Sequence, residues 1–108
     1  MAKDYMDERI EYLFRGILTL KTMEDCRAFF EDICTVKEIS EMSRRLDAAR
    51  MLDDNKIYNE IADATGLSTA TISRVNRCLQ YGAGGYNKAF ERLRKQDTPD
   101  EKTDGEEK

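Results

Sequence analysis

The stretch from Tyr58 to Arg77, YNEIADATGLSTATISRVNR, constrains the fold of this chain most, because two helical patterns flank a single glycine. Ile57, Ile61 and Ala62 recur at helical spacing and predict one apolar stripe on a first helix. Gly66 is expected to end that helix, since glycine accepts the left-handed backbone conformation that a sharp corner requires.

The residues after the glycine predict a second helix that packs back on the first. Leu67 is expected to be a buried plug, and Ser68 is a good N-cap for the helix that follows. The buried stripe of this second helix is expected to consist of Ile72, Val75 and Leu79. Two short helices with a tight corner over residues 57–79 predict a helix-turn-helix.

The outward face of the second helix is short, polar and basic, with no acidic residue from Ser68 to Gln80. A helix that enters the major groove needs small residues at close approaches, and hydroxyl and guanidinium groups for phosphates and base edges. We expect Thr69, Ala70 and Ser73 to approach bases, and Arg74, Arg77 and Lys88 to hold phosphates. The full set of predicted DNA contacts is Ser68, Thr69, Ala70, Thr71, Ser73, Arg74, Arg77 and Lys88.

The net charge of −4 is distributed unevenly along the chain. Residues 66–95 carry six basic side chains and one acidic side chain, whereas residues 1–65 carry ten basic and fifteen acidic ones. The local charge within about a Debye length of the phosphates, roughly 10 Å, governs DNA binding more than the total charge does. The composition therefore remains compatible with a DNA-binding function.

Four further helices are predicted around this pair, so the fold class is all-α. The first is expected at residues 4–20, and the second follows an N-cap at Thr22 and ends at residue 33. The third begins with the capping box Thr35-Val36-Lys37-Glu38 and ends at Leu52, and the last is expected at residues 86–95. In the last of these, Tyr86, Phe90 and Leu93 should point inward. Asp53-Asp54-Asn55 is expected to break the third helix and cap the next. Residues 1–95 should form one domain, and residues 96–108 a disordered acidic tail.

The first two helices carry more apolar surface than two short helix-turn-helix helices can cover. Their stripes contain Met6, Ile10, Leu13, Phe14, Ile17, Cys26, Phe29, Phe30 and Ile33. We infer a homodimer in which these helices wrap around the partner subunit; the alternative is a compact monomeric core.

Several classes of function are disfavoured by what the sequence contains. The chain has no histidine and its cysteines, Cys26, Cys34 and Cys78, are scattered, so we expect small buried thiols and no metal site. No nucleophile–base pair stands out, so no catalytic residue, enzyme activity or cofactor is expected. No signal peptide or membrane span is evident, which predicts a cytoplasmic protein with no membrane partner.

The sequence resembles the Trp repressor superfamily, specifically the Trp repressor-like (YerC/YecD) family of small bacterial proteins. The resemblance covers about residues 5–95 and rests on Thr35-Val36-Lys37-Glu38, on Ala70-Thr71-Ile72-Ser73-Arg74, and on the order of six helices. It implies a six-helix intertwined homodimer that presents two helix-turn-helix units to a palindromic DNA operator.

The resemblance also implies a ligand gap, because the Trp repressor holds tryptophan between two arginines. The matching positions here are Arg45 and Arg74. The residue after the second arginine is a glycine in the tryptophan-binding protein, but it is Val75 here. Since a valine side chain would occupy space that the ligand needs, we expect no binding of tryptophan.

The sequence thus predicts a homodimeric bacterial transcriptional regulator, a repressor, that binds double-stranded DNA through its helix-turn-helix. Two alternatives remain. A helical protein–protein interaction module would suit the acidic first half and acidic tail of the chain. A sensor of an unknown small ligand would act through the gap between Arg45 and Arg74.

Overall fold

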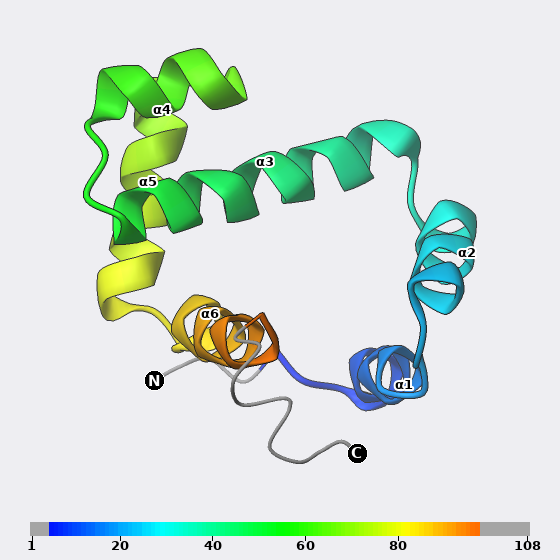
Figure 1. Cartoon of the computed structure of the whole chain (residues 1–108). Helices are drawn as coiled ribbons and strands as arrows, with labels where there is room; N and C mark the ends of the chain where they lie inside the picture. The colour runs from blue at the N-terminus through cyan, green and yellow to red at the C-terminus, as the bar shows by residue number, and fades with distance from the viewer. Residues whose placement is uncertain (1–4, 98–108) are drawn as a thin grey trace. The chain divides into compact units, whose positions relative to one another are not determined.

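The computed structural model describes residues 5–97, in which there are six helices and no strand (Figure 1). The prediction of an all-α fold with six helices is confirmed. The helices are α1 (Glu8–Ile17), α2 (Met23–Ile33), α3 (Val36–Asp53), α4 (Tyr58–Thr65), α5 (Thr69–Tyr81) and α6 (Gly85–Gln96). The chain divides into two compact units, residues 1–39 and residues 40–108.

The first unit contains α1, α2 and the start of α3, each begun by a side-chain cap. The Asp7 carboxylate accepts a hydrogen bond from the Ile10 amide at 2.9 Å, which starts α1 four residues later than the expected residue 4. The Thr22 hydroxyl accepts from the Asp25 amide at 3.0 Å, as predicted for α2. No residue of α1 or α2 is buried.

The capping box at Thr35 is confirmed in atomic detail. The Thr35 amide donates to the Glu38 carboxylate at 2.8 Å, and the Glu38 amide donates to the Thr35 hydroxyl at 3.0 Å. These reciprocal bonds satisfy two amides that the first helical turn would leave without a partner. The helix they begin, α3, continues to Asp53, one residue beyond the predicted end.

The second unit is built around one apolar cluster to which α3, α4, α5 and α6 all contribute. Its buried members are Ala48, Ala49, Ile61, Ile72, Val75, Leu79 and Phe90. Ile61 and Ile72 are fully buried, and Ala48 and Ala49 are small enough for the other helices to approach α3 closely. The predicted buried stripe of α5 is confirmed.

Two predictions about the start of α4 are wrong. Ile57 lies at the N-cap position and its side chain is 63% exposed, so the apolar stripe of α4 does not include it. Asn55 turns the chain with a φ of 65° but does not cap α4. The helix begins instead with the Ile57 amide donating to the Glu60 carboxylate at 3.3 Å. Leu67, expected to be buried, is half-buried against the core.

The last helix is tied to α5 by a side-chain bond. The Asn87 amide group donates to the carbonyl oxygen of Leu79 at 3.2 Å, and Tyr86 stacks on Phe90 with 6.2 Å between ring centroids. Leu93, expected to point inward, is 46% exposed. Helix α6 runs one residue past the predicted boundary at 95, and residues 98–108 of the predicted disordered tail lie outside the described residues.

Two properties of the described residues bear on the excluded classes of function. All three cysteines are free, but Cys26 and Cys78 are exposed, which corrects the prediction of buried thiols. None of the helices in the described part of the chain is long and apolar enough to cross a membrane.

Candidate nucleic-acid interface

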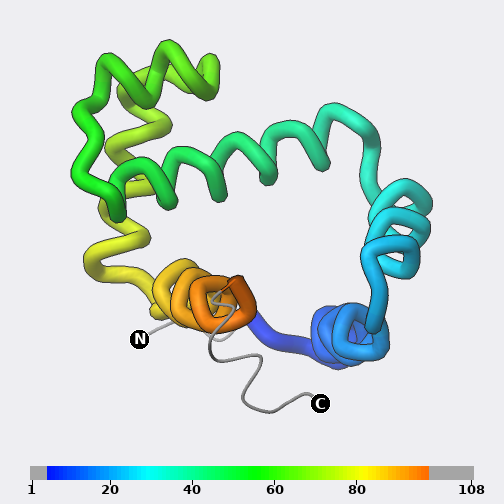
Figure 2. The backbone as a smooth tube through the Cα atoms, in the orientation of Figure 1, coloured from blue at the N-terminus to red at the C-terminus, as the bar shows by residue number. Residues whose placement is uncertain are grey.

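The corner between α4 and α5 positions the candidate interface, and Figure 2 shows the backbone turning there. Gly66 adopts φ 76° and ψ 6°, the left-handed conformation expected for it, and its amide donates to the carbonyl of Ala62 at 2.8 Å. The buried Thr65 hydroxyl donates to the Ile61 carbonyl at 2.7 Å and accepts from the Leu67 amide at 3.2 Å. Because the polar groups of the turn are bonded, the corner fixes where α5 begins.

Two predicted DNA contacts, Ser68 and Thr71, shape the first turn of α5. The Ser68 hydroxyl accepts from the Thr71 amide and donates to the Thr71 hydroxyl, both at 3.1 Å. Ser68 is thus the predicted N-cap, and its oxygen is engaged within the protein. Thr71 is half-buried, so it contributes less to the outward face than the sequence suggested.

Five of the predicted contact residues lie together on the exposed side of α5. The side chains of Thr69, Ala70, Ser73, Arg74 and Arg77 are all exposed, opposite the buried Ile72, Val75 and Leu79. We call these five residues the α5 outer face. No acidic residue lies within α5. The helix is held against α4 by the shared core and by a hydrogen bond of 3.4 Å from the Asn76 amide group to the Tyr58 hydroxyl.

The eighth predicted contact, Lys88, is placed apart from the others. It is exposed on α6, where its amide bonds the carbonyl oxygen of Gly84 at 3.0 Å. Among the described contacts, none joins the Lys88 side chain to the α5 outer face. Its proposed role therefore rests on its charge alone.

The two arginines of the predicted ligand gap do meet at one cavity, of about 320 Å³. Its lining consists of Arg45, Thr71, Arg74, Val75, Cys78 and Tyr86. Val75 is 3% exposed and packs in the core, yet space remains beside it. The predicted gap did not include Cys78, Tyr86 or Thr71, the last of which was predicted only as a DNA contact. Cys78 stands one helical turn after Arg74, a spacing that could have revealed it, whereas Tyr86 comes from another helix.

The surroundings of the Tyr86 phenol, which lines this cavity, shift its pKa. Burial raises its pKa above the usual value of about 10, and the Coulombic effect of nearby Cys78 acts in the same direction. The Arg45 guanidinium opposes this shift, because a nearby positive charge favours the ionised phenol. The cavity is lined by two basic groups, Arg45 and Arg74, whose charge suits an anionic group.

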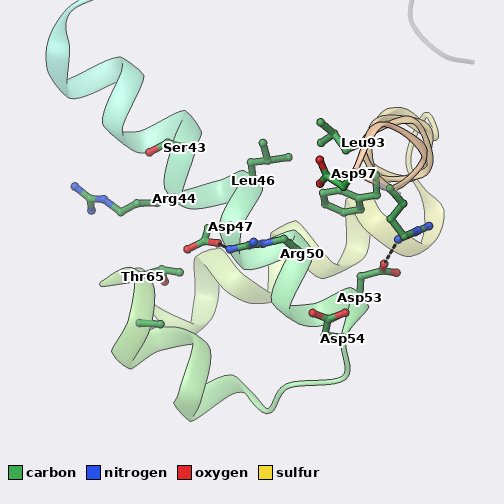
Figure 3. A pocket seen from close by; sticks show the side chains of 13 residues that line it. Ser43, Arg44, Leu46, Asp47, Arg50, Asp53, Asp54, Thr65, Leu93 and Asp97 are labelled. Atoms are coloured by element: carbon green, nitrogen blue, oxygen red, sulfur yellow. Dashed lines mark hydrogen bonds and ion pairs between the residues drawn. The ribbon is translucent and has the colours of Figure 1, made fainter. Parts of the chain in front are cut away.

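A larger cavity of about 830 Å³ lies among α3, α4 and α6 (Figure 3). Ion pairs between Asp47 and Arg50 and, at 3.4 Å, between Asp53 and Arg94 line it. Leu46 and Leu93 add apolar walls that are 41% and 46% exposed. This cavity thus combines exposed apolar side chains with paired charges.

Comparison with known proteins places these features in a family. The sequence profile of the family described as "Trp repressor protein" matches residues 8–94. The uncharacterized protein YerC of Bacillus subtilis is 46% identical over 91 residues, which are 84% of this chain and 88% of that protein.

Two solved structures are also similar. A TrpR-like protein from Eubacterium eligens has 50% identity and a TM-score of 0.78, covering 81% of this chain and 90% of that one. A candidate Trp repressor from Staphylococcus aureus has 43% identity and a TM-score of 0.79, covering 82% of this chain and 89% of that one.

Proposed function

The chain belongs to the Trp repressor family, in its YerC-like group, and we propose that it is a sequence-specific DNA-binding transcriptional regulator that acts as a homodimer. In this proposal α5 enters the major groove of a palindromic operator and represses transcription by occupying it. Binding, rather than catalysis, is the activity that we assign to the chain.

The α5 outer face is the single observation that carries this proposal. A helix that reads DNA must expose small and hydroxyl-bearing side chains close to the bases, flanked by cations for the phosphates. Ala70 and Ser73 meet the first need, and Arg74 and Arg77 meet the second. The fully buried Ile61 and Ile72 fix this face outward because any rotation of α5 would expose the apolar core.

The homodimer is proposed from apolar surface that a single chain leaves uncovered. In the first unit, Phe14 of α1 and Met6, which precedes that helix, expose 39% and 45% of their surface. In α3 and α6, Met42, Leu46 and Leu93 expose 41–46%. Exposed apolar faces of this extent mark association sites, and a second copy of the chain is the partner that the family membership favours.

A dimer also explains how a short helix can select one site in a genome. Two copies of α5 related by two-fold symmetry would read half-sites about one helical turn, or 34–36 Å, apart. The operator should accordingly be an inverted repeat.

Selection of duplexes from a random-sequence pool by the purified chain tests the proposal. A DNA reader enriches an inverted repeat over successive rounds, whereas a helical module that binds only proteins enriches no motif. If no sequence motif is enriched although circular dichroism shows that the preparation is helical, the DNA-binding assignment is overturned and the protein-interaction alternative is favoured.

The cavity between Arg45 and Arg74 supports a second candidate function, a sensor of a small anionic ligand. Its 320 Å³ is at the lower end of the roughly 300–1,000 Å³ typical of ligand sites. Thr71, Arg74 and Val75 line it from α5 itself, so an occupant would act directly on the DNA-binding helix. Tryptophan is not the expected occupant, because Val75 stands where that ligand needs space. Affinity for the selected duplex that changes with an added ligand would establish this role.

A further inference from the structure

The outward side of α5 extends beyond the five residues of the α5 outer face, to the last residue of the helix, Tyr81. The Tyr81 side chain is 86% exposed, more than any other large apolar or aromatic side chain among the described residues. Successive helical residues turn by about 100°, so Tyr81 projects within about 40° of Ala70, Arg74 and Arg77. It therefore continues the α5 outer face at the C-terminal end of the helix.

The backbone around Tyr81 is held in place although its side chain is exposed. The Gly82 amide donates to the Cys78 carbonyl at 2.8 Å and closes the last turn of α5. The Asn87 side chain bonds the Leu79 carbonyl at 3.2 Å, which ties the same end of α5 to α6. In the described part of the chain the Tyr81 side chain has no hydrogen-bond or ring partner, so its hydroxyl is available to a ligand.

The length of α5 determines what Tyr81 meets when the N-terminal turns of the helix lie in the major groove. Tyr81 is eleven residues beyond Ala70, about 16 Å along the axis at roughly 1.5 Å per residue. The major groove is about 12 Å wide. A helix whose first turns contact base edges thus carries its end past the groove, to the sugar–phosphate backbone at the rim.

We propose that Tyr81 is a further DNA contact, whose hydroxyl donates a hydrogen bond to a phosphate oxygen at the edge of the operator half-site. This inference rests on the proposed DNA-binding function and deepens it. A phenol is a suitable donor for a phosphate oxygen and carries no charge at neutral pH. Tyr81 therefore adds affinity and fixes the position of α5 without adding to the basic charge of the interface.

The absence of charge gives Tyr81 a signature that separates it from Arg77. Salt weakens protein–DNA binding in proportion to the phosphates neutralised by lysine and arginine. Replacing Tyr81 with phenylalanine removes only a hydroxyl. We expect Tyr81→Phe to lower affinity for the selected duplex about two- to tenfold, the equivalent of one hydrogen bond, with the salt slope unchanged.

Fluorescence anisotropy with the selected duplex at several salt concentrations measures both quantities. Tyr12→Phe is the matched control, because Tyr12 is 72% exposed on α1, where Arg15 stacks over its ring. This control should bind as the unaltered chain does. Sedimentation of each variant checks that dimerisation is unchanged.

Replacing the phosphates of the selected duplex one at a time with neutral methylphosphonate identifies the phosphate that Tyr81 contacts. One substitution at the edge of the half-site should weaken the unaltered chain but leave Tyr81→Phe unaffected, since the bond is already lost. Equal affinities of Tyr81→Phe and the unaltered chain would overturn the inference while the proposed function stood. A lower affinity accompanied by loss of the dimer would overturn it as well. If the unaltered chain bound no duplex, both proposals would fail.

Discussion

Replacing Gly66 with alanine isolates the backbone requirement of the corner between α4 and α5. Gly66 has a φ of 76°, a conformation that side chains with a Cβ rarely adopt. An added Cβ would meet nothing closer than the Arg44 guanidinium, 4.0 Å away, which is ordinary van der Waals contact. The cost of Gly66→Ala is therefore conformational and not steric.

The magnitude follows from two opposing effects. Holding a non-glycine residue in the left-handed region costs roughly 1–2 kcal/mol. Alanine also restricts the unfolded chain, which favours folding by about 0.4–1 kcal/mol. The free energy of unfolding should fall by about 1 kcal/mol, and for a domain of this size the Tm should fall by about 4 °C.

Thermal unfolding followed by circular dichroism measures this change, with all variants at one protein concentration because dimerisation makes Tm concentration-dependent. Gly85→Ala is the matched control, since Gly85 begins α6 without a positive φ and an added Cβ would have open space. It should be neutral or slightly stabilising. Gly66→Asn should recover part of the loss, because asparagine tolerates the left-handed region. Equal Tm values for Gly66→Ala and Gly85→Ala would refute the reasoning.

Three further predictions concern the α5 outer face and the adjacent cavity. Thr69→Ala should change the motif enriched from a random pool, because Thr69 is exposed at the start of α5; an identical motif would remove it from base contact. Calorimetry should detect no saturable binding of tryptophan, because Val75, which lines the cavity, stands where the resemblance places a glycine in the tryptophan-binding protein; a saturable isotherm would contradict this. Burial raises the Tyr86 pKa, so this residue contributes stability that is fully present below about pH 10 and is lost as the pH rises through its folded pKa. The free energy of unfolding of Tyr86→Phe should therefore fall less than that of the unaltered chain between neutral and strongly alkaline pH. Equal falls in the two proteins would contradict this prediction.

The helix-turn-helix was predictable from sequence because its signals are local. Gly66 ends α4, Ser68 caps α5, and Ile72 and Val75 lie on one face of a single helix. The capping box at Thr35 is likewise complete within four residues. In these segments the residue type and its spacing determine the backbone directly.

The errors arose where a local turn interrupts the helical period, or where the outcome depends on residues distant in the chain. Apolar Ile57 fits the period of α4 but precedes its first turn, because the chain is still leaving the left-handed Asn55. Tyr86 reaches the cavity beside Arg74 from another helix, and no spacing within α5 encodes that contact. Leu93 belongs to an apolar stripe, but periodicity cannot specify whether the same chain or a second copy covers it.

The salt dependence of DNA binding by Arg77→Ala tests the DNA-binding role of the α5 outer face most directly. Arg27→Ala is the matched control, because it removes the same charge from α2, where Arg27 pairs with Glu31 at 2.9 Å. The account predicts that Arg77→Ala binds selected and random duplexes more weakly and that its plot of log affinity against log salt is shallower by about 0.9, the loss of one phosphate contact. Arg27→Ala should keep the slope of the unaltered chain. An unchanged salt slope for Arg77→Ala, or an equal loss of DNA affinity in Arg77→Ala and Arg27→Ala, would contradict the account.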